Sequence, residues 1–174
     1  MSAGLSFEEL MEYTEWERGK WREWFATRDN SVLEIKTGDN GDGRFNTIGD
    51  VIRHIFSAEA RYVDKLRERP LTDTALIAST NAEGLFQFGQ KSRAELREFV
   101  KSRSAQEWDT MLEFRMFGKV LRGTPRKIIG HVLTHEIRHW AQIATMLRLN
   151  GLKVDWQDFL FSPVLGGGVE QEPE

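Results

Sequence analysis

The chain of 174 residues contains no cysteine. It therefore cannot form a disulfide, cannot bind a metal through thiolates and cannot use a cysteine nucleophile. Any metal site has to be built from histidine and carboxylate side chains.

The sequence also lacks membrane and nucleic-acid signals. It has no apolar run of membrane-spanning length, and its N-terminus lacks the basic start and apolar stretch of a secretory signal. The net charge is −3 with acids and bases interspersed, whereas nucleic-acid-binding domains carry a concentrated basic surface. We therefore expect a cytoplasmic protein that binds neither membranes nor nucleic acids.

The length and composition fit one globular domain. Hydrophobic residues make up 40% and charged residues 29% of the chain, and the 11 phenylalanines and six tryptophans predict an aromatic core. We expect a single domain over residues 1–165, with Trp156, Phe159, Leu160 and Phe161 packing back on it. The glycine- and acid-rich residues 166–174 are typical of a disordered tail.

Apolar residues recur at three- and four-residue spacing in four segments, which predicts four amphipathic helices and an all-α fold. The fourth has clear ends, because Thr124-Pro125 is a strong helix start and Asn150-Gly151 a strong stop. The expected helices cover about residues 7–27, 46 to before Pro70, 81–102 and 125–149.

The segment before the fourth helix has a different pattern. Leu112, Phe114 and Met116 alternate with charged residues, and Gly118-Lys119 can form a turn. We expect a short β-hairpin or an irregular segment here.

Three of the four histidines, His131, His135 and His139, are spaced four apart on the fourth helix, so they project from one side. His135 and His139 can reach one divalent ion. His131 and His139 are about 12 Å apart at ~1.5 Å rise per residue, too far to share that ion. A third ligand should come from another helix, and the remaining histidine, His54, can lie opposite in an antiparallel bundle.

Three imidazoles with an open position are typical of a catalytic site, where the ion activates water or a thiolate. The simplest alternative is an accidental repeat of histidines at the core edge. His135-Glu136-x-x-His139 also matches the zinc-protease motif, but no histidine follows it and no strand-rich half precedes it. We rank both alternatives below a metal site in a helix bundle.

The motifs around His54 (His-Ile-Phe-Ser-Ala-Glu) and from His131 to Gln142 (His-x-x-x-His-Glu-x-x-His-x-x-Gln) resemble the DinB/YfiT-like superfamily. The resemblance extends from the first helix to about Phe161. It implies an up-down four-helix bundle of DinB type that binds a divalent metal through His54, His135 and His139, with zinc or nickel ahead of iron.

The resemblance also suggests roles for residues near the ligands. His131 and Gln142 are expected beside the ligands or in the pocket. Glu136 is a weak candidate for acid–base catalysis, because it points about 100° away from His135 around the helix. Trp140-Ala141 replaces an Arg-Gly pair that is common in the family, so the pocket is expected to differ.

Members of this superfamily share a fold more than a reaction. They include thiol transferases, maleylpyruvate isomerase, an iron-binding domain of sulfoxide synthases and proteins described as metal-dependent hydrolases. We expect a low-molecular-weight thiol S-transferase with a small-molecule substrate, a thiol cosubstrate and a homodimeric assembly. The alternatives are a hydrolase of ester or amide bonds and a non-enzymatic, stress-related metal-binding module.

Overall fold

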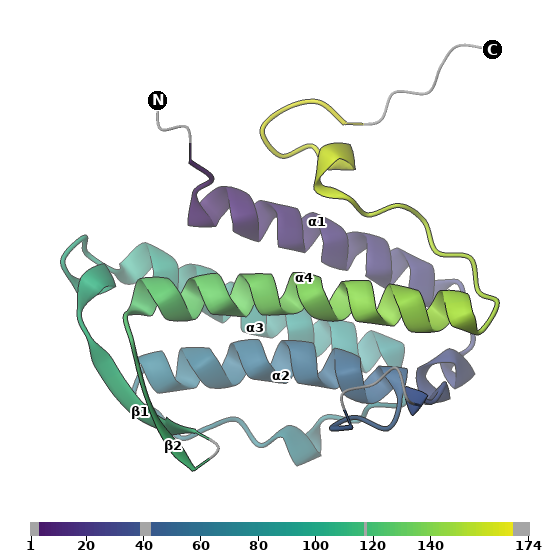
Figure 1. Ribbon diagram of the computed structural model, residues 1–174, viewed down its shortest axis with the longest axis horizontal. Coiled ribbons are helices and arrows are strands. Elements are labelled where there is room, and N and C mark those ends of the chain that lie inside the picture. Colours follow the sequence, from purple (N-terminus) through teal and green to yellow (C-terminus); the bar gives the residue numbers. More distant parts are fainter. Residues whose placement is uncertain (1–3, 39–42, 117, 169–174) are drawn as a thin grey trace.

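The computed structural model describes residues 4–38, 43–116 and 118–168 (Figure 1). It contains four α-helices, so the expected four-helix bundle is confirmed. The fourth helix has the predicted bounds, and the others begin and end within a few residues of them. The helices are α1 (Phe7–Ala26), α2 (Ile48–Leu66), α3 (Ala82–Ser102) and α4 (Pro125–Leu149).

Side-chain caps fix where the helices begin. Ser6 and Glu9 form a capping box at α1, in which each side chain accepts a hydrogen bond from the other residue's backbone N–H. The Thr124 hydroxyl accepts from the backbone N–H of Lys127, ahead of a proline in the first turn of α4. The start of α4 in turn sets the position of its histidines.

The helices run up, down, down and up. In α2 and α3 the contacts advance in the same direction, from Glu59 with Ser92 to Arg67 with Glu98, so these helices are parallel (Figure 1). Residues 67–81 connect α2 to α3 and bring the chain back along the bundle, so that both helices start at the same end. Both α2 and α1 pack against α3 and α4. Helix α4 is antiparallel to α2, because contacts shift from His54–His135 to Tyr62–His131.

Two glycines allow close approach to α2. A Cβ atom on Gly49 would lie 1.9 Å from the backbone oxygen of Ser79, and one on Gly89 would lie 2.8 Å from the Phe56 ring. Gly49 lets the 67–81 connection cross the start of α2, and Gly89 lets α3 pack against it.

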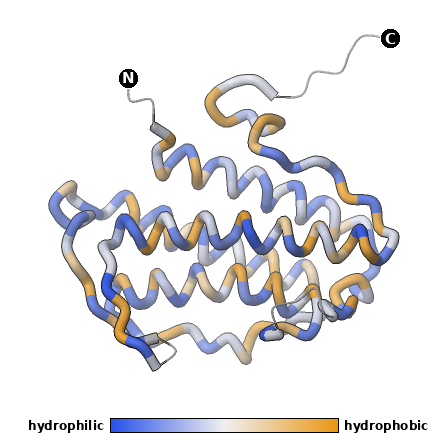
Figure 2. Tube along the Cα trace, viewed as in Figure 1, coloured by the Kyte–Doolittle hydropathy of each residue, from blue (hydrophilic) through white to orange (hydrophobic). Residues whose placement is uncertain are grey.

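Aromatic side chains fill the centre of the bundle. Trp21 of α1 stacks on Trp140 of α4, with ring centroids 5.2 Å apart and an interplanar angle of 17°. Trp140 also stacks on Phe86 of α3, and both tryptophans are fully buried. Hydrophobic and hydrophilic residues alternate along each helix (Figure 2), as the periodicity predicted.

The expected β-hairpin is confirmed. Strands β1 (Leu112–Met116) and β2 (Lys119–Gly123) pair antiparallel, with Leu112 opposite Gly123 and Met116 opposite Lys119. Lys65 of α2 donates a hydrogen bond to the Arg115 carbonyl at 3.3 Å. The hairpin therefore lies beside the C-terminal half of α2.

The segment after α4 packs partly on α1. The Tyr13 hydroxyl and the Trp24 indole donate to the carbonyls of Gln157 and Lys153, both at 2.9 Å. Tyr13 also contacts the Phe159 ring, whereas Trp156 is 77% exposed and Leu160 is 81% exposed, so the expected packing is only partial. The predicted disordered tail over 166–174 falls largely outside the described residues.

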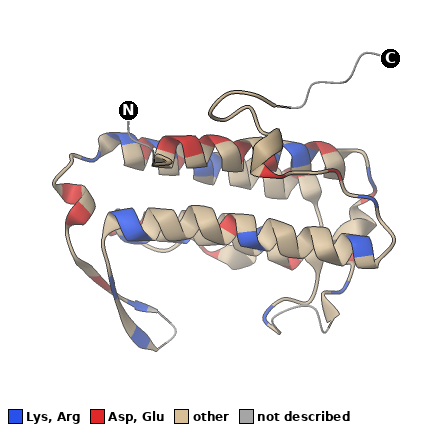
Figure 3. Cartoon of the chain, turned by 45° about the horizontal axis from the view of Figure 1, so that its top comes forward, with Lys and Arg blue, Asp and Glu red and all other residues tan. Residues whose placement is uncertain are grey.

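Charged residues of both signs are distributed over the helices (Figure 3). Within the described ranges, no helix has the length and apolar character needed to cross a membrane.

Candidate metal centre

The structure brings together the three histidines that the sequence analysis selected. His54 comes from α2, and His135 and His139 lie one turn apart on α4. The Nε2 atom of His135 is 3.0 Å from Nε2 of His54 and 3.1 Å from Nε2 of His139. One ligand nitrogen from each side chain lies within 4.8 Å of the other two.

The spacing and the chemistry of these nitrogens suit a divalent ion. Two ligands bound at ~2.1 Å lie about 3.0–3.4 Å apart for bond angles near 90–109°. An imidazole Nε2 carries either one proton or one lone pair, so Nε2 of His135 cannot form a full hydrogen bond with both neighbours. A cation between the three side chains can accept a lone pair from each.

His135 is kept neutral by its surroundings. Burial, followed by the nearby His139, His54, His131 and Arg138, lowers its pKa from 6.5 to about 3. Its lone pair is therefore available to a metal at neutral pH.

Gln142 lies one turn after His139 and orients it. Its Oε1 atom is 2.9 Å from Nδ1 of His139. An amide oxygen only accepts, so we assign the proton of His139 to Nδ1, which leaves the lone pair on Nε2. This contact agrees with a position for Gln142 beside the ligands.

Phe45 was not singled out from the sequence, although it covers the site. Its ring lies 4.5 Å from the His54 ring and 6.0 Å from the His139 ring. It precedes α2 in a turn-rich segment that has no helical or strand periodicity, so no sequence pattern marked it.

His131 lies outside the cluster of three histidines. Its ring is 5.3 Å from both His135 and Tyr62, and the residue is exposed. It lines a cavity of about 520 Å³ that opens beside His54 and His135, between α2, α4 and the hairpin. This volume lies in the range of small-molecule pockets.

Glu136 points away from the histidines into a buried ionic network. Each of the four helices α1 to α4 contributes one residue to this network, in order Arg18, Glu59, Arg93 and Glu136. Arg93 pairs with Glu136 at 2.7 Å, and Arg18 forms a further ion pair with it. Glu136 is 1% exposed, so the structure does not bring this acid–base candidate to the site.

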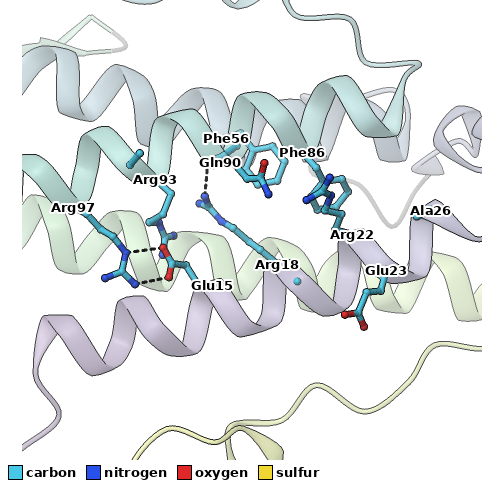
Figure 4. Close-up of a pocket in the computed structure, with 13 residues that line it drawn as sticks. Glu15, Arg18, Arg22, Glu23, Ala26, Phe56, Phe86, Gln90, Arg93 and Arg97 are labelled. Atoms are coloured by element: carbon cyan, nitrogen blue, oxygen red, sulfur yellow. Dashed lines mark hydrogen bonds and ion pairs between the residues drawn. The ribbon is translucent and has the colours of Figure 1, made fainter.

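Arginines hold the Glu59 carboxylate in its charged form. Although burial opposes ionisation of Glu59, Arg18 and Arg93 together hold its pKa below the usual value. Figure 4 shows both arginines extending between the helices from α1 and α3, where they line a second cavity of about 600 Å³ that contains no histidine. The sequence did not lead us to predict this network. One signal was available, because Glu59 falls on the apolar stripe of α2 and is therefore a charged residue at a core position.

Trp140, the first residue of the Trp140-Ala141 pair, faces the core. Besides its aromatic contacts, its indole N–H donates to Glu136 Oε1 at 3.1 Å. Trp140 therefore belongs to the bundle interior and does not line the cavity beside His54 and His135, whereas the neighbouring Ala141 is exposed.

Comparisons with known proteins agree with this fold. The structure is similar to that of YfiT from Bacillus subtilis, which is described as a probable metal-dependent hydrolase with an unusual four-helix bundle topology. The TM-score is 0.67 at 15% sequence identity, over 88% of this chain and 94% of YfiT. A search of curated proteins found no match. The model of the DinB family matches residues 1–170, nearly the whole chain, and we conclude that the protein belongs to the DinB family.

Proposed function

We propose that this protein is a metal-dependent enzyme acting on a small molecule, with one divalent ion held by His54, His135 and His139. The observation that supports the proposal is the convergence of three imidazole nitrogens beside a cavity of about 520 Å³. Zinc and nickel are the first candidates and iron is the third, because all three suit imidazole ligands. A bound ion lowers the pKa of water or of a thiol, so that either becomes a nucleophile near neutral pH.

The first reaction that we propose is transfer of a low-molecular-weight thiol to an electrophile, with the thiol as cosubstrate. In this reaction His54, His135 and His139 hold the ion, Gln142 orients His139, and Phe45 shields the ligands from water. The cavity between α2 and α4, which His131 also lines, holds the substrate.

The second candidate is hydrolysis of an ester or amide, favoured by the likeness to YfiT. The same three histidines and the same cavity serve this reaction, with water in place of the thiol.

We also propose that the protein is a homodimer and that it is cytoplasmic. Light scattering of the purified protein tests the homodimer.

Metal analysis of protein purified without a histidine tag tests the site. We expect about one divalent ion per chain, and a loss of metal affinity of at least tenfold in each of His54→Ala, His135→Ala and His139→Ala. His131→Ala is the matched control, because His131 lies on the same helix face but outside the cluster. Wild-type protein without stoichiometric metal, or ligand variants that bind it normally, would refute the metal site.

Activity assays then separate the reactions. Metal-loaded protein is incubated with a panel of thiols and electrophiles and, separately, with esters and amides. Turnover of one panel that disappears in His135→Ala identifies the reaction. No turnover of either panel, together with a large loss of stability on metal removal, would instead support a structural role in a non-enzymatic module.

A further inference from the structure

The cavity beside the histidines is unusually rich in cations. Its lining includes Arg61 and Lys65 from α2, Arg115 from the hairpin and Arg138 from α4. Among the residues that the structure describes, no aspartate or glutamate lines it. Substrates entering this cavity therefore meet positive charge next to the three histidines.

These cations differ from most arginines of the protein. Within the described ranges, ten arginines pair with a carboxylate, as Arg53 does with Asp50 and Arg122 with Glu113. Over the described parts of the chain, Arg61, Arg115 and Arg138 have no such ion pair. Lys65 contacts the Arg115 carbonyl and the Phe114 ring.

The carboxylates on the neighbouring elements are engaged elsewhere. In α4 the only acid is Glu136, which is buried in the ionic network. In α2, Glu59 belongs to the same network, Asp50 pairs with Arg53, and Asp64 binds Arg69 and Thr72. The cavity's positive charge is therefore not neutralised by the helices that form it.

Helix geometry places the cations close to the proposed ion. Arg61 follows His54 by seven residues and Arg138 follows His135 by three, so each arginine projects near the same face as its histidine. The backbone separations along the helix axes are about 10 Å and about 5 Å, at ~1.5 Å per residue. A guanidinium group forms charge-assisted hydrogen bonds with carboxylate and phosphate oxygens.

From this arrangement we propose that the substrate is a small anionic molecule whose carboxylate or phosphate group binds Arg61 and Arg138 while its reactive group faces the histidines. This inference rests on the proposed function for the position of the reactive group. The cations converge on a concave cavity and not on an extended surface, which fits a small molecule. The anionic and reactive groups should lie within a few bonds of each other, because both arginines start within two helical turns of the ligands.

Hydroxamates that bind the metal test this proposal without assuming a reaction. Acetohydroxamate is the neutral probe, succinate monohydroxamate adds a carboxylate, and 3-phosphonopropionohydroxamate adds a phosphonate. Their Kd values are measured calorimetrically on metal-loaded protein. We expect at least one anionic probe to bind about tenfold more tightly than acetohydroxamate, as one charge-assisted hydrogen bond supplies. The preferred anionic probe distinguishes a carboxylate from a phosphate group.

Variants show whether the arginines cause the preference. In the double variant Arg61→Gln/Arg138→Gln, we expect the anionic preference to fall below threefold while metal content and acetohydroxamate affinity are unchanged. Arg148→Gln is the control, because Arg148 lies on α4 and also has no carboxylate partner among the described residues, but does not line the cavity. Equal binding of all three probes, or a preference that survives the double variant, would overturn the proposal.

The anion site can be separated from the metal site. If the protein binds no metal, the metal proposal fails and the anion proposal is tested by titrating succinate and inorganic phosphate into the same protein. We then expect NMR shifts of the Arg61 and Arg138 side-chain N–H signals with at least one of the two anions. Unchanged signals with both anions would contradict the anion site.

Discussion

His135 and Glu136 are adjacent in the sequence, yet their side chains point from different sides of α4. The imidazole of His135 meets His54 and His139, whereas the carboxylate of Glu136 lies between Arg18 and Arg93 in the centre of the bundle. One helical step of about 100° separates the two directions. Helix α4 therefore joins the candidate site directly to the ionic network.

Glu136→Gln should mainly destabilise the fold. The change leaves two buried arginines without one of their carboxylates, which typically costs about 3–5 kcal/mol. Urea unfolding measures the loss, and metal content should be retained at low temperature. Glu98→Gln, which alters an exposed ion pair, should cost less than about 1 kcal/mol. A stable Glu136→Gln protein that binds metal but has lost activity would instead indicate a catalytic carboxylate.

Gln142→Ala should weaken metal binding without unfolding the protein. Loss of the acceptor for Nδ1 of His139 lets the imidazole rotate and change tautomer, and such contacts contribute about 10–100-fold to metal affinity. Competition with a chromophoric chelator measures the change. Thr145→Ala, one turn later on α4, is the control, because in the described part of the chain the Thr145 hydroxyl forms hydrogen bonds only within α4, with Ala141 and Arg148. Equal affinities in wild type and Gln142→Ala would show that the contact is dispensable.

Glu17 should make stability depend on pH. Burial, together with the nearby Glu136, raises its pKa from 4.5 to about 9, and its Oε2 atom has no hydrogen-bond partner among the described residues. Between these values the unfolded chain has released a proton that the folded chain retains, so this residue lowers stability as pH rises from 4.5 to 9. Glu17→Gln should remove that contribution.

Urea unfolding at several pH values between 5 and 9 checks this prediction. The stability advantage of Glu17→Gln over wild type should increase across the series. Glu12→Gln, at an exposed position of α1, should follow wild type. A constant difference at all pH values would mean that Glu17 is ionised in the folded protein.

Gly49→Ala should be strongly destabilising. Its new methyl group would meet the Ser79 backbone oxygen, which cannot move away like a flexible side chain. We expect a loss of more than about 2 kcal/mol in thermal or urea unfolding. Gly19→Ala in α1 has open space around the new methyl, and should stabilise the protein by about 0.5–1 kcal/mol. A neutral Gly49→Ala would show that the 67–81 connection shifts easily.

Local signals in the sequence predicted the helices well. Periodic apolar residues and the Thr124-Pro125 start gave the helices, and the four-residue spacing placed His135 beside His139. The parallel course of α2 and α3 had no such signal, because it depends on how the 67–81 connection crosses Gly49. The pairing of Arg18 with Glu136 depends on the register of α1 against α4, over 118 residues of sequence separation.

The cationic cavity could not be predicted either, because it too depends on how distant segments of the chain pack together. Arg61, Arg115 and Arg138 are far apart in the sequence and resemble the many surface arginines of this chain. Only the folded protein shows that the nearby carboxylates are occupied by other partners.

His54 and His135 are 81 residues apart and belong to different helices. An ion bound to both would act as a cross-link, closing a long loop that contains all of α3 and the hairpin. For a permanent link of this length, the chain-entropy model gives a stabilisation of about 4–5 kcal/mol. A protein that lacks cysteine would thus have a reversible counterpart of a disulfide, and its resistance to unfolding would follow the supply of metal.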